Sequence, residues 1–194
     1  MPNDTPTYPN WFASVAQHNF EQFIRPLAPL PDLKFLQLGV FTGDASEWML
    51  KNILTKEGDL LLDVDTWKGS AEEAHDAMDF EDVYNTYKKK MDPYQRIRSV
   101  RNTTTNFLNA NHGPMFDFIY IDADHTADGV LADARGAWKL LKTGGILSFD
   151  DYLWSHESGD PKLAPKLGID TFLDEQGEDY DLLEYGYQVW LVKK

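Results

Sequence analysis

The chain has 194 residues, and its 18 Lys and Arg residues against 32 Asp and Glu residues give a formal charge of −14. This length fits one domain of about 100 to 200 residues, and a hydrophobic share of 42% is enough to form a core. The absence of cysteine excludes disulfides, thiolate nucleophiles and cysteine-bound metals. Because binding to phosphate backbones depends on clustered Lys and Arg, we do not expect nucleic acid as a partner.

The sequence predicts neither a membrane partner nor a secretion signal. No apolar run reaches the roughly 18 residues of a membrane span, and the start of the chain is polar and rich in proline. We therefore expect a cytoplasmic protein with a polar tail at residues 1–10 and a single domain at residues 11–194. Apolar residues at near-helical spacing between Trp11 and Ile24, ahead of Pro26, predict an N-terminal helix over residues 11–25.

The rest of the chain alternates short apolar runs with helical patterns, which is typical of a mostly parallel sheet covered by helices on both faces. The expected elements are strands at 35–40, 60–65, 97–101, 116–121 and 145–149, helices at 44–54, 71–91, 130–141 and 169–175, and a closing hairpin of strands at 181–185 and 188–192. Thr143, Gly144 and Gly145 are interpreted as a turn between helix and strand. The charged stretch at 71–91 is best interpreted as a solvated helix, with a lid or a homodimer surface as the alternatives.

Ligands of such sheets bind beyond the carboxyl ends of the strands. After the first strand, Gly39 would let a ligand approach the backbone, and Gly43 opens a helix whose free N–H groups favour hydrogen-bond acceptors. The spacing matches neither the dinucleotide motif nor the phosphate-binding P-loop. A tight turn that binds nothing explains these two glycines about equally well.

The second strand ends at Asp65, which is followed by Thr66 and Trp67. An acid at this place can accept hydrogen bonds from both hydroxyls of a ribose. Asp63 shares a face with Asp65 and is an alternative for this role, although Asp65 lies closer to the strand end. Trp67 could lie against a flat base, and packing in the core explains it equally well.

Three acids follow the fourth and fifth strands. Asp122 ends one strand and the pair Asp150 and Asp151 ends the other, so neighbouring strands would bring them together. Carboxylates this close repel one another unless a cation lies between them, and magnesium prefers oxygen ligands. We therefore predict a metal site, and helix capping is the alternative. His125 is the candidate general base, against the alternative of a solvated loop histidine.

At this point the chain resembles the class I S-adenosylmethionine-dependent methyltransferases, most closely the branch that methylates oxygen on small molecules and sugars. The resemblance runs from about residue 35 to residue 194, and its most specific stretches are FDFIYIDADHTADGV and LLKTGGILSFDDY, supported by FLQLGVFTGDAS and LLDVDTW. The resemblance implies an α/β, Rossmann-like sheet of seven mostly parallel strands, with an antiparallel last strand and helices on both faces.

The resemblance also implies a cofactor site for S-adenosylmethionine. The loop from Gly39 to Gly43 would hold the methionine part, Asp65 the ribose, and the turn at Asn102 and Thr103 would lie near the adenine. The full set of expected cofactor-binding residues is Gln37, Gly39, Phe41, Gly43, Asp65, Thr66, Trp67, Asn102, Thr103 and Asp122. The family usually has an acid at the position of Gln37, where it anchors the cofactor amine, so this contact differs here.

Metal-dependent relatives such as catechol O-methyltransferase bind magnesium through an acid after strand four and an Asp-Asn pair after strand five. Those positions resemble Asp122, Asp150 and Asp151, so the second residue of the pair is an acid here. The lysine of these relatives corresponds to His125, and macrolide-sugar methyltransferases resemble the chain in having histidine there. The resemblance implies that His125 takes the proton of the acceptor.

The expected activity is magnesium-dependent O-methylation of a small-molecule acceptor, such as a sugar or a catechol-like diol. One alternative is a metal-independent methyltransferase that acts on nitrogen or oxygen. Another is a noncatalytic module that binds S-adenosylmethionine. A DNA amino-methyltransferase is disfavoured by the net charge and by the absence of an Asn/Asp-Pro-Pro-aromatic motif after strand four.

Overall fold

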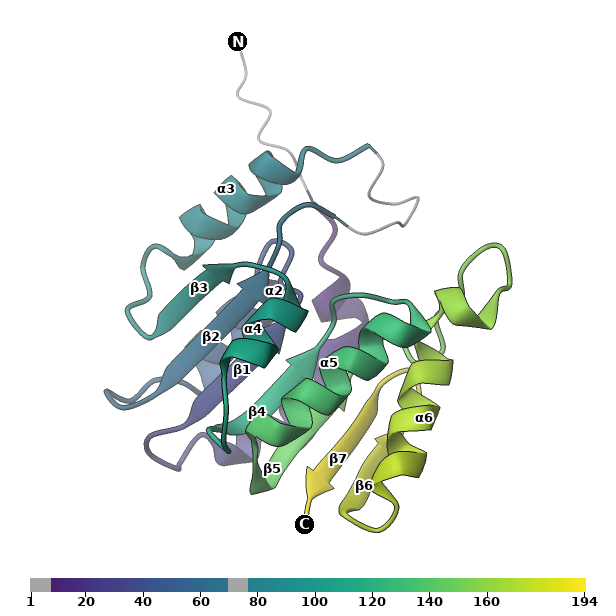
Figure 1. Ribbon diagram of the computed structural model, residues 1–194. Coiled ribbons are helices and arrows are strands. Elements are labelled where there is room, and N and C mark those ends of the chain that lie inside the picture. The colour runs from purple at the N-terminus through teal and green to yellow at the C-terminus, as the bar shows by residue number, and fades with distance from the viewer. Residues whose placement is uncertain (1–7, 70–76) are drawn as a thin grey trace.

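The computed structural model describes residues 8–69 and 77–194 (Figure 1). Most of the predicted polar tail and the first part of the helix predicted at 71–91 therefore lie outside the described residues. Within the described parts of the chain, no helix is long and apolar enough to cross a membrane.

In the described residues, seven strands form one sheet in the order β3-β2-β1-β4-β5-β7-β6. They are β1 (Lys34–Leu38), β2 (Leu60–Asp65), β3 (Ile97–Arg101), β4 (Phe116–Ile121), β5 (Leu141–Phe149), β6 (Tyr180–Tyr185) and β7 (Val189–Lys193). The pairs among β1 to β5 are parallel, and β7 is antiparallel to both β5 and β6. This arrangement confirms the predicted α/β fold. Because the strand order reverses between β1 and β4, a crevice is expected beyond their carboxyl ends.

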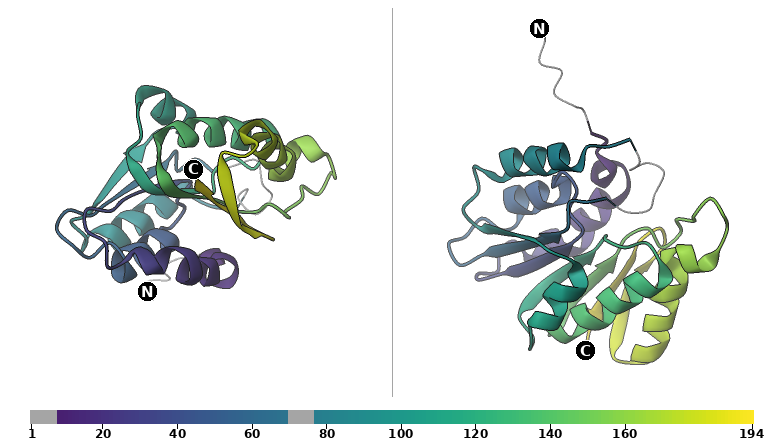
Figure 2. Two further views of the ribbon diagram at one scale, coloured as in Figure 1. Left: turned by 90° about the horizontal axis from the view of Figure 1, so that it is seen from below. Right: turned by 45° about the horizontal axis from the view of Figure 1, so that its top comes forward.

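Helices cover both faces of the sheet, as Figure 2 shows from below. One face carries the N-terminal helical segment, α2 (Asp44–Asn52) and α3 (Phe80–Met91), and its core includes Phe20, Met49 and Tyr87. The other face carries α4 (Thr104–Ala110), α5 (Ala127–Leu140) and α6 (Pro165–Gln176), preceded by a single turn η5 (Pro161–Leu163). Two separate hydrophobic cores therefore fix the sheet from opposite sides.

The N-terminal segment is helical as predicted, but most of it is wound more widely than an α-helix. It consists of η1 (Phe12–Ala16), α1 (Gln17–Asn19), η2 (Phe20–Ile24) and a tight last turn η3 (Arg25–Leu27). The ring of Phe20 is fully buried and meets Tyr120 and Trp190 edge-on, with ring centroids 5.0 and 5.3 Å apart. These contacts attach the segment to β4 and β7.

Capping side chains place several helix starts away from the predicted bounds. α3 begins at Phe80 because the Asp79 carboxylate accepts hydrogen bonds from the next free N–H groups, so residues 77–79 are not helical. α5 begins at Ala127, earlier than predicted, because Thr126 caps it in the same way. The short helix α4, capped by Thr103, was not predicted.

The C-terminal half also differs from the predicted bounds in detail. β5 begins at Leu141 instead of 145, although its pairing with β4 shifts register before Ile146 and Gly144 has a φ of 78°. An irregular stretch therefore stands where the turn at 143–145 was expected. α6 begins at Pro165, four residues before the predicted start, because proline at the first position of a helix has no N–H to satisfy.

A buried carboxyl group joins β2 to two helices beneath the crevice. Asp63 is fully buried, and its Oδ2 atom accepts hydrogen bonds from the hydroxyls of Ser46 on α2 and Tyr87 on α3, at 2.7 and 2.9 Å. Burial raises the pKa of Asp63 to about 7, an effect that these two hydrogen bonds only partly oppose. The Ser46 hydroxyl also lies 3.0 Å from Oε1 of Gln37, so the network reaches β1.

The raised pKa predicts a specific pH dependence of stability. The folded protein keeps a proton on Asp63 at pH values where the unfolded chain, with an ordinary pKa of about 3.9, has lost it. The stability that this proton contributes is complete below pH ~4 and is lost as the pH rises to 7. Between pH 5 and pH 8, wild type should lose about 2 to 3 kcal/mol more unfolding free energy than Asp63→Asn, as measured by urea denaturation.

Asp174→Asn on the exposed side of α6 is the matched control and should follow the wild-type pH profile. Parallel profiles for wild type and Asp63→Asn would contradict the assignment of this pH dependence to Asp63.

Candidate functional site

A cavity of about 690 Å³ opens beyond the carboxyl ends of β1, β2, β4 and β5. This size is within the range of small-molecule sites. Its walls come from the N-terminal helical segment, the β1–α2 loop, the start of α4 and the residues that follow β2, β4 and β5. The cavity therefore lies where the reversal of strand order predicts a ligand site.

Gly39 directly follows β1 and lies against the backbone of Asp122, which directly follows β4. Its φ is +80°, and a Cβ atom at this position would lie 1.7 Å from the carbonyl oxygen of Asp122. Backbone hydrogen bonds fix the approach, because Gly39 donates to Val64 and Asp122 donates to Leu38, at 2.9 and 2.8 Å. Only glycine fits here, so Gly39 has a steric role that does not depend on a ligand.

We expect Gly39→Ala to lower the free energy of unfolding by more than about 3 kcal/mol, because the new methyl group would collide with rigid backbone. Gly113→Ala is the matched control. Its φ is +81° but nothing lies within 4 Å of the added Cβ atom, so it should cost only the ~1 kcal/mol of a left-handed backbone. Urea denaturation compares the two variants, and equal losses would contradict the collision.

The Asp65 carboxylate organises the β1–α2 loop from inside the cavity. Its Oδ2 atom accepts hydrogen bonds from the N–H groups of Val40 and Phe41 at 2.7 and 3.1 Å, and its Oδ1 atom accepts one from Trp67 at 2.7 Å. Phe41 has a φ of +54°, which is unfavourable for a residue with a side chain. Hydrogen bonds to a charged acceptor offset this cost, so Asp65 shapes the loop that follows Gly39.

The other residues expected to bind the cofactor are distributed unevenly around the cavity. Gly43 and Asn102 are not among the lining residues of the cavity. The other expected residues do line it, namely Gln37, Gly39, Phe41, Asp65, Thr66, Trp67, Thr103 and Asp122. Gly43 precedes α2 with a φ of +79°, and a Cβ atom there would lie 2.8 Å from the ring of Tyr87. Its position serves packing between α2 and α3. Asn102 is exposed and accepts a hydrogen bond from the Thr103 N–H at 2.9 Å.

Trp67 and Gln37 face the cavity but are held by protein contacts. Trp67 is only 1% exposed, and its indole, 4.7 Å from the ring centroids of both Tyr84 and Tyr87, donates a hydrogen bond to the Phe41 carbonyl at 2.9 Å. The buried Gln37 amide donates to the Gly39 carbonyl at 3.0 Å. This hydrogen bond keeps Gln37, one of the residues predicted to bind the cofactor, beside the β1–α2 loop.

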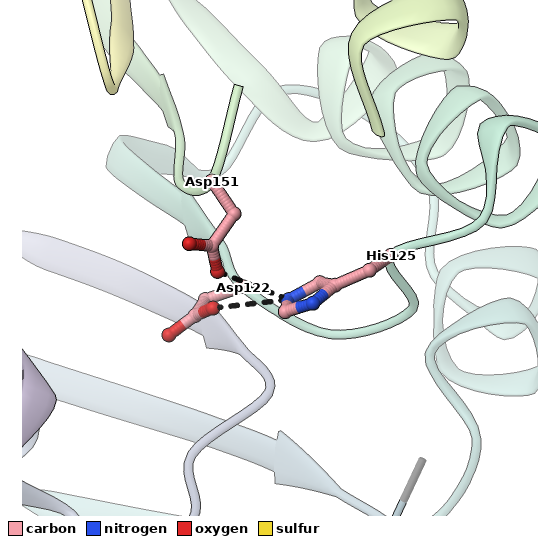
Figure 3. Close-up of side chains that lie close together, drawn as sticks. All are labelled: Asp122, His125 and Asp151. Carbon is pink, nitrogen blue, oxygen red and sulfur yellow. Dashed lines mark ion pairs between the residues drawn. The ribbon is translucent and has the colours of Figure 1, made fainter. Parts of the chain in front are cut away.

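Asp122, His125 and Asp151 converge at one point of the cavity wall (Figure 3). The Nε2 atom of His125 lies 3.6 Å from Oδ1 of Asp122 and 3.3 Å from Oδ2 of Asp151. Each of the three side chains offers one possible metal-ligand atom, and these atoms all lie within 4.8 Å of one another. The structure thus brings together two of the predicted metal acids and the predicted base.

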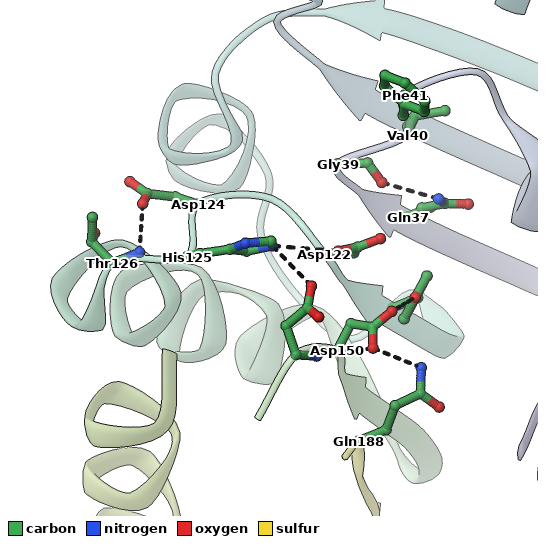
Figure 4. A network of polar contacts seen from close by, with 12 residues as sticks. Gln37, Gly39, Val40, Phe41, Asp122, Asp124, His125, Thr126, Asp150 and Gln188 are labelled. Carbon is green, nitrogen blue, oxygen red and sulfur yellow. Dashed lines mark hydrogen bonds and ion pairs between the residues drawn. The ribbon is translucent and has the colours of Figure 1, made fainter. Parts of the chain in front are cut away.

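The third predicted acid, Asp150, is held beside this cluster by hydrogen bonds from the protein (Figure 4). Its carboxylate accepts hydrogen bonds from the hydroxyl of Tyr120, from the amide of Gln188 at 3.0 Å and from the N–H of Asp151 at 2.9 Å. Asp150 lines the cavity, but its ligand atoms are not part of the group formed by the other three residues.

Gln188 is a site residue that the sequence did not reveal. It is 1% exposed, and its Oε1 atom accepts hydrogen bonds from Asn19 Nδ2 and Trp190 Nε1 at 2.9 and 3.0 Å. These two donors orient the Gln188 amide so that its N–H group points at Asp150. A contact across 169 positions joins Asn19 to Gln188, and no local pattern in the sequence predicts it.

The pKa values of Asp122 and Asp150 are both raised. Burial is the main cause for both Asp122 and Asp150, and repulsion from neighbouring carboxylates adds to it. A cation among them would lower these pKa values, and carboxylate oxygens are the ligands that hard divalent ions prefer. The residues present therefore fit a divalent cation, with Asp122 and Asp151 as the oxygen ligands.

A family model described as a methyltransferase domain matches residues 36–152, which is more than half of the chain. The chain belongs to this family. The match spans β1 to the acids after β5, and together with the seven-stranded sheet it confirms the resemblance to class I enzymes. The protein is an S-adenosylmethionine-dependent methyltransferase.

Solved structures share the fold of this methyltransferase at low sequence identity. The O-methyltransferase NovP is 14% identical with a TM-score of 0.68, and the match covers 91% of this chain and 78% of NovP. An O-methyltransferase from Bacillus cereus, solved with S-adenosylhomocysteine, is 18% identical with a TM-score of 0.63 and coverage of 94% and 86%. A candidate rRNA methylase from Clostridium thermocellum is 12% identical with a TM-score of 0.68 and coverage of 97% and 100%. No curated protein matched the chain.

Proposed function

We propose that this methyltransferase transfers the methyl group of S-adenosylmethionine to a hydroxyl oxygen of a small molecule, with the aid of a divalent cation such as magnesium. The observation that carries this proposal is the convergence of Asp122, His125 and Asp151 on one point of the cavity wall. Two carboxylates and an imidazole at one point suit the positioning and deprotonation of a hydroxyl group. The O-methyltransferases among the structural neighbours are consistent with this chemistry.

The β1–α2 loop is the proposed site of the methionine part of the cofactor, with the ribose on the side of Asp65. The close approach of Gly39 to Asp122 places this loop next to the acid cluster. Asp65 already accepts three backbone hydrogen bonds, and two carboxylate oxygens have lone pairs for further donors such as ribose hydroxyls. Thr103, which caps α4, is the proposed neighbour of the adenine.

Asp122 and Asp151 would hold the cation, and Asp150 would add its charge beside them. A bound divalent cation would orient the acceptor oxygen and lower its pKa. Tyr187 donates a hydrogen bond to Oδ1 of Asp151 at 2.8 Å, so this carboxylate keeps its other oxygen toward His125. Such fixed placement lets the protein align the acceptor oxygen with the methyl carbon before transfer.

His125 is the proposed general base. It lies within 3.6 Å of both cation-binding carboxylates, so it is close to any oxygen that they position. The side chain of Trp154 covers it, with ring centroids 5.3 Å apart. A partly enclosed imidazole between two carboxylates can take the hydroxyl proton and release it to solvent after methyl transfer.

A nucleic-acid acceptor and a metal-independent transferase are the alternatives to this proposal. The formal charge of −14 opposes an acceptor with a phosphate backbone. The three converging side chains favour a transferase that uses a divalent cation, because their possible ligand atoms all lie within 4.8 Å of one another.

Titration calorimetry with S-adenosylmethionine and magnesium tests the cofactor and the cation separately. Wild type should bind both, whereas Asp151→Asn should keep cofactor binding and weaken magnesium binding by about tenfold or more. Asp128→Asn, an exposed change on α5, is the control and should behave as wild type. If wild type binds the cofactor but no magnesium, the proposed role of the cation is contradicted. If wild type binds neither ligand, the whole proposal is contradicted.

His125→Gln should lower kcat by about 10² to 10⁴ while the affinity for magnesium stays within a factor of about three. Added imidazole should restore part of the activity, because it can replace the missing base. Release of S-adenosylhomocysteine measures the rate, and His112→Gln is the exposed control. A large loss of magnesium affinity in His125→Gln would instead make His125 a ligand of the cation.

A further inference from the structure

The cavity has an unusual charge composition. Six of its lining residues are aspartates, namely Asp44, Asp65, Asp122, Asp124, Asp150 and Asp151. Among the described residues that form its walls, none is Lys or Arg, and His125 is the one side chain that can become cationic near neutral pH.

The two acids on the cofactor side of the cavity are held by an ion pair or by backbone hydrogen bonds. Asp44 forms an ion pair with Lys90 on α3, with Nζ 2.5 Å from Oδ1. The carboxylate of Asp65 accepts three backbone hydrogen bonds. Both residues lie at the β1–α2 and β2 side of the cavity, where the cofactor is expected.

The remaining four acids follow β4 and β5, at the side proposed for the acceptor. A divalent cation would balance two of these charges and the sulfonium of the cofactor a third, so the wall would not become positive even with both ligands bound. An additional carboxylate or phosphate on the acceptor would meet no opposite charge. In a cavity partly closed to water, such unbalanced charges interact more strongly than they do in bulk solvent.

Aromatic faces complete the wall. Trp154 lies against His125, and Trp11, which is 44% exposed, lies 4.9 Å from the ring of Phe41. All four residues line the cavity. The face of an indole ring attracts cations and stacks on flat or ring-shaped groups, and it offers nothing to an anion.

We infer that the cavity selects its acceptor by charge. It accepts hydroxyl compounds that are neutral or carry an amine, and it excludes those that carry a carboxylate or a phosphate. This inference rests on the proposed function and adds the substrate class to it. Asp124 contributes to the selection through its charge, and it is outside the proposed cation and base set.

Matched acceptors that differ only in charge test the inference. One series is 3,4-dihydroxybenzylamine, 3,4-dihydroxybenzyl alcohol and 3,4-dihydroxybenzoate, and a second is methyl glucosaminide, methyl glucoside and methyl glucuronide. Calorimetry on the complex with S-adenosylhomocysteine and magnesium measures binding, and methyl transfer from S-adenosylmethionine measures turnover. In at least one series, the amine and the neutral compound should bind about tenfold or more tightly than the acid, and high salt should reduce the difference.

Each outcome separates this inference from the proposed function. Binding in the expected order without turnover supports charge selection and contradicts methyl transfer to these hydroxyls. Turnover of the acid as fast as its neutral counterpart overturns charge selection and leaves the proposed function intact. Failure of both neutral compounds and both amines to bind at millimolar concentration overturns the inference.

Two variants locate the source of the selection. Asp124→Asn removes one charge from the cavity wall and retains an oxygen that can accept the Thr126 N–H, as the carboxylate does at 2.8 Å. It should lower the preference for the amine over the acid about threefold. Asp128→Asn removes the same charge from the exposed face of α5 and should leave the preference unchanged. Equal effects of the two variants would attribute the preference to net charge and overturn the role of the cavity.

Discussion

The contact between the backbones of Gly39 and Asp122 is the constraint on which the rest of the site depends. Because β1 and β4 are neighbours at the reversal of strand order, their ends approach so closely that no side chain fits at Gly39. This approach places the loop after β1 beside the residue that ends β4. The loop proposed to hold the cofactor and the acid cluster therefore share one cavity.

The carboxylates in and beneath the cavity differ in the hydrogen-bond donors that surround them. Asp63 is buried where its neutral form is favoured, between the hydroxyls of Ser46 and Tyr87. Asp65 accepts hydrogen bonds from backbone N–H groups, and Asp150 is held by Tyr120 and Gln188. Asp122 and Asp151 have fewer such donors and are thus the acids left to act on a ligand. The distribution of hydrogen-bond donors, more than the acids themselves, sets which carboxylate has which role.

Much of the sheet and part of the site could be predicted because they depend on local patterns. The strands at 60–65, 97–101 and 116–121 coincide with β2, β3 and β4. β2 and β4 are mostly apolar runs, as is typical of buried parallel strands. Asp122 and Asp151 could be placed together because parallel strands end at one edge. The start of α3 at Phe80, the short helix α4 and the role of Gln188 could not be predicted in this way. They depend on capping geometry and on contacts between residues that are distant in the sequence.

The hydrogen bond between Asn19 and Gln188 has a consequence for how the protein is made. Asp150 is held by an amide that is itself oriented by the first helical segment, and that amide follows Asp150 by 38 positions in the sequence. A chain growing on the ribosome can pair β1 to β5 well before residue 188 emerges. Its acid wall, however, gains its last donor only when the closing hairpin inserts β7 beside β5. The hydrogen bonds that hold Asp150 are thus completed only after β6 and β7 have been made, later than the pairing of β1 to β5.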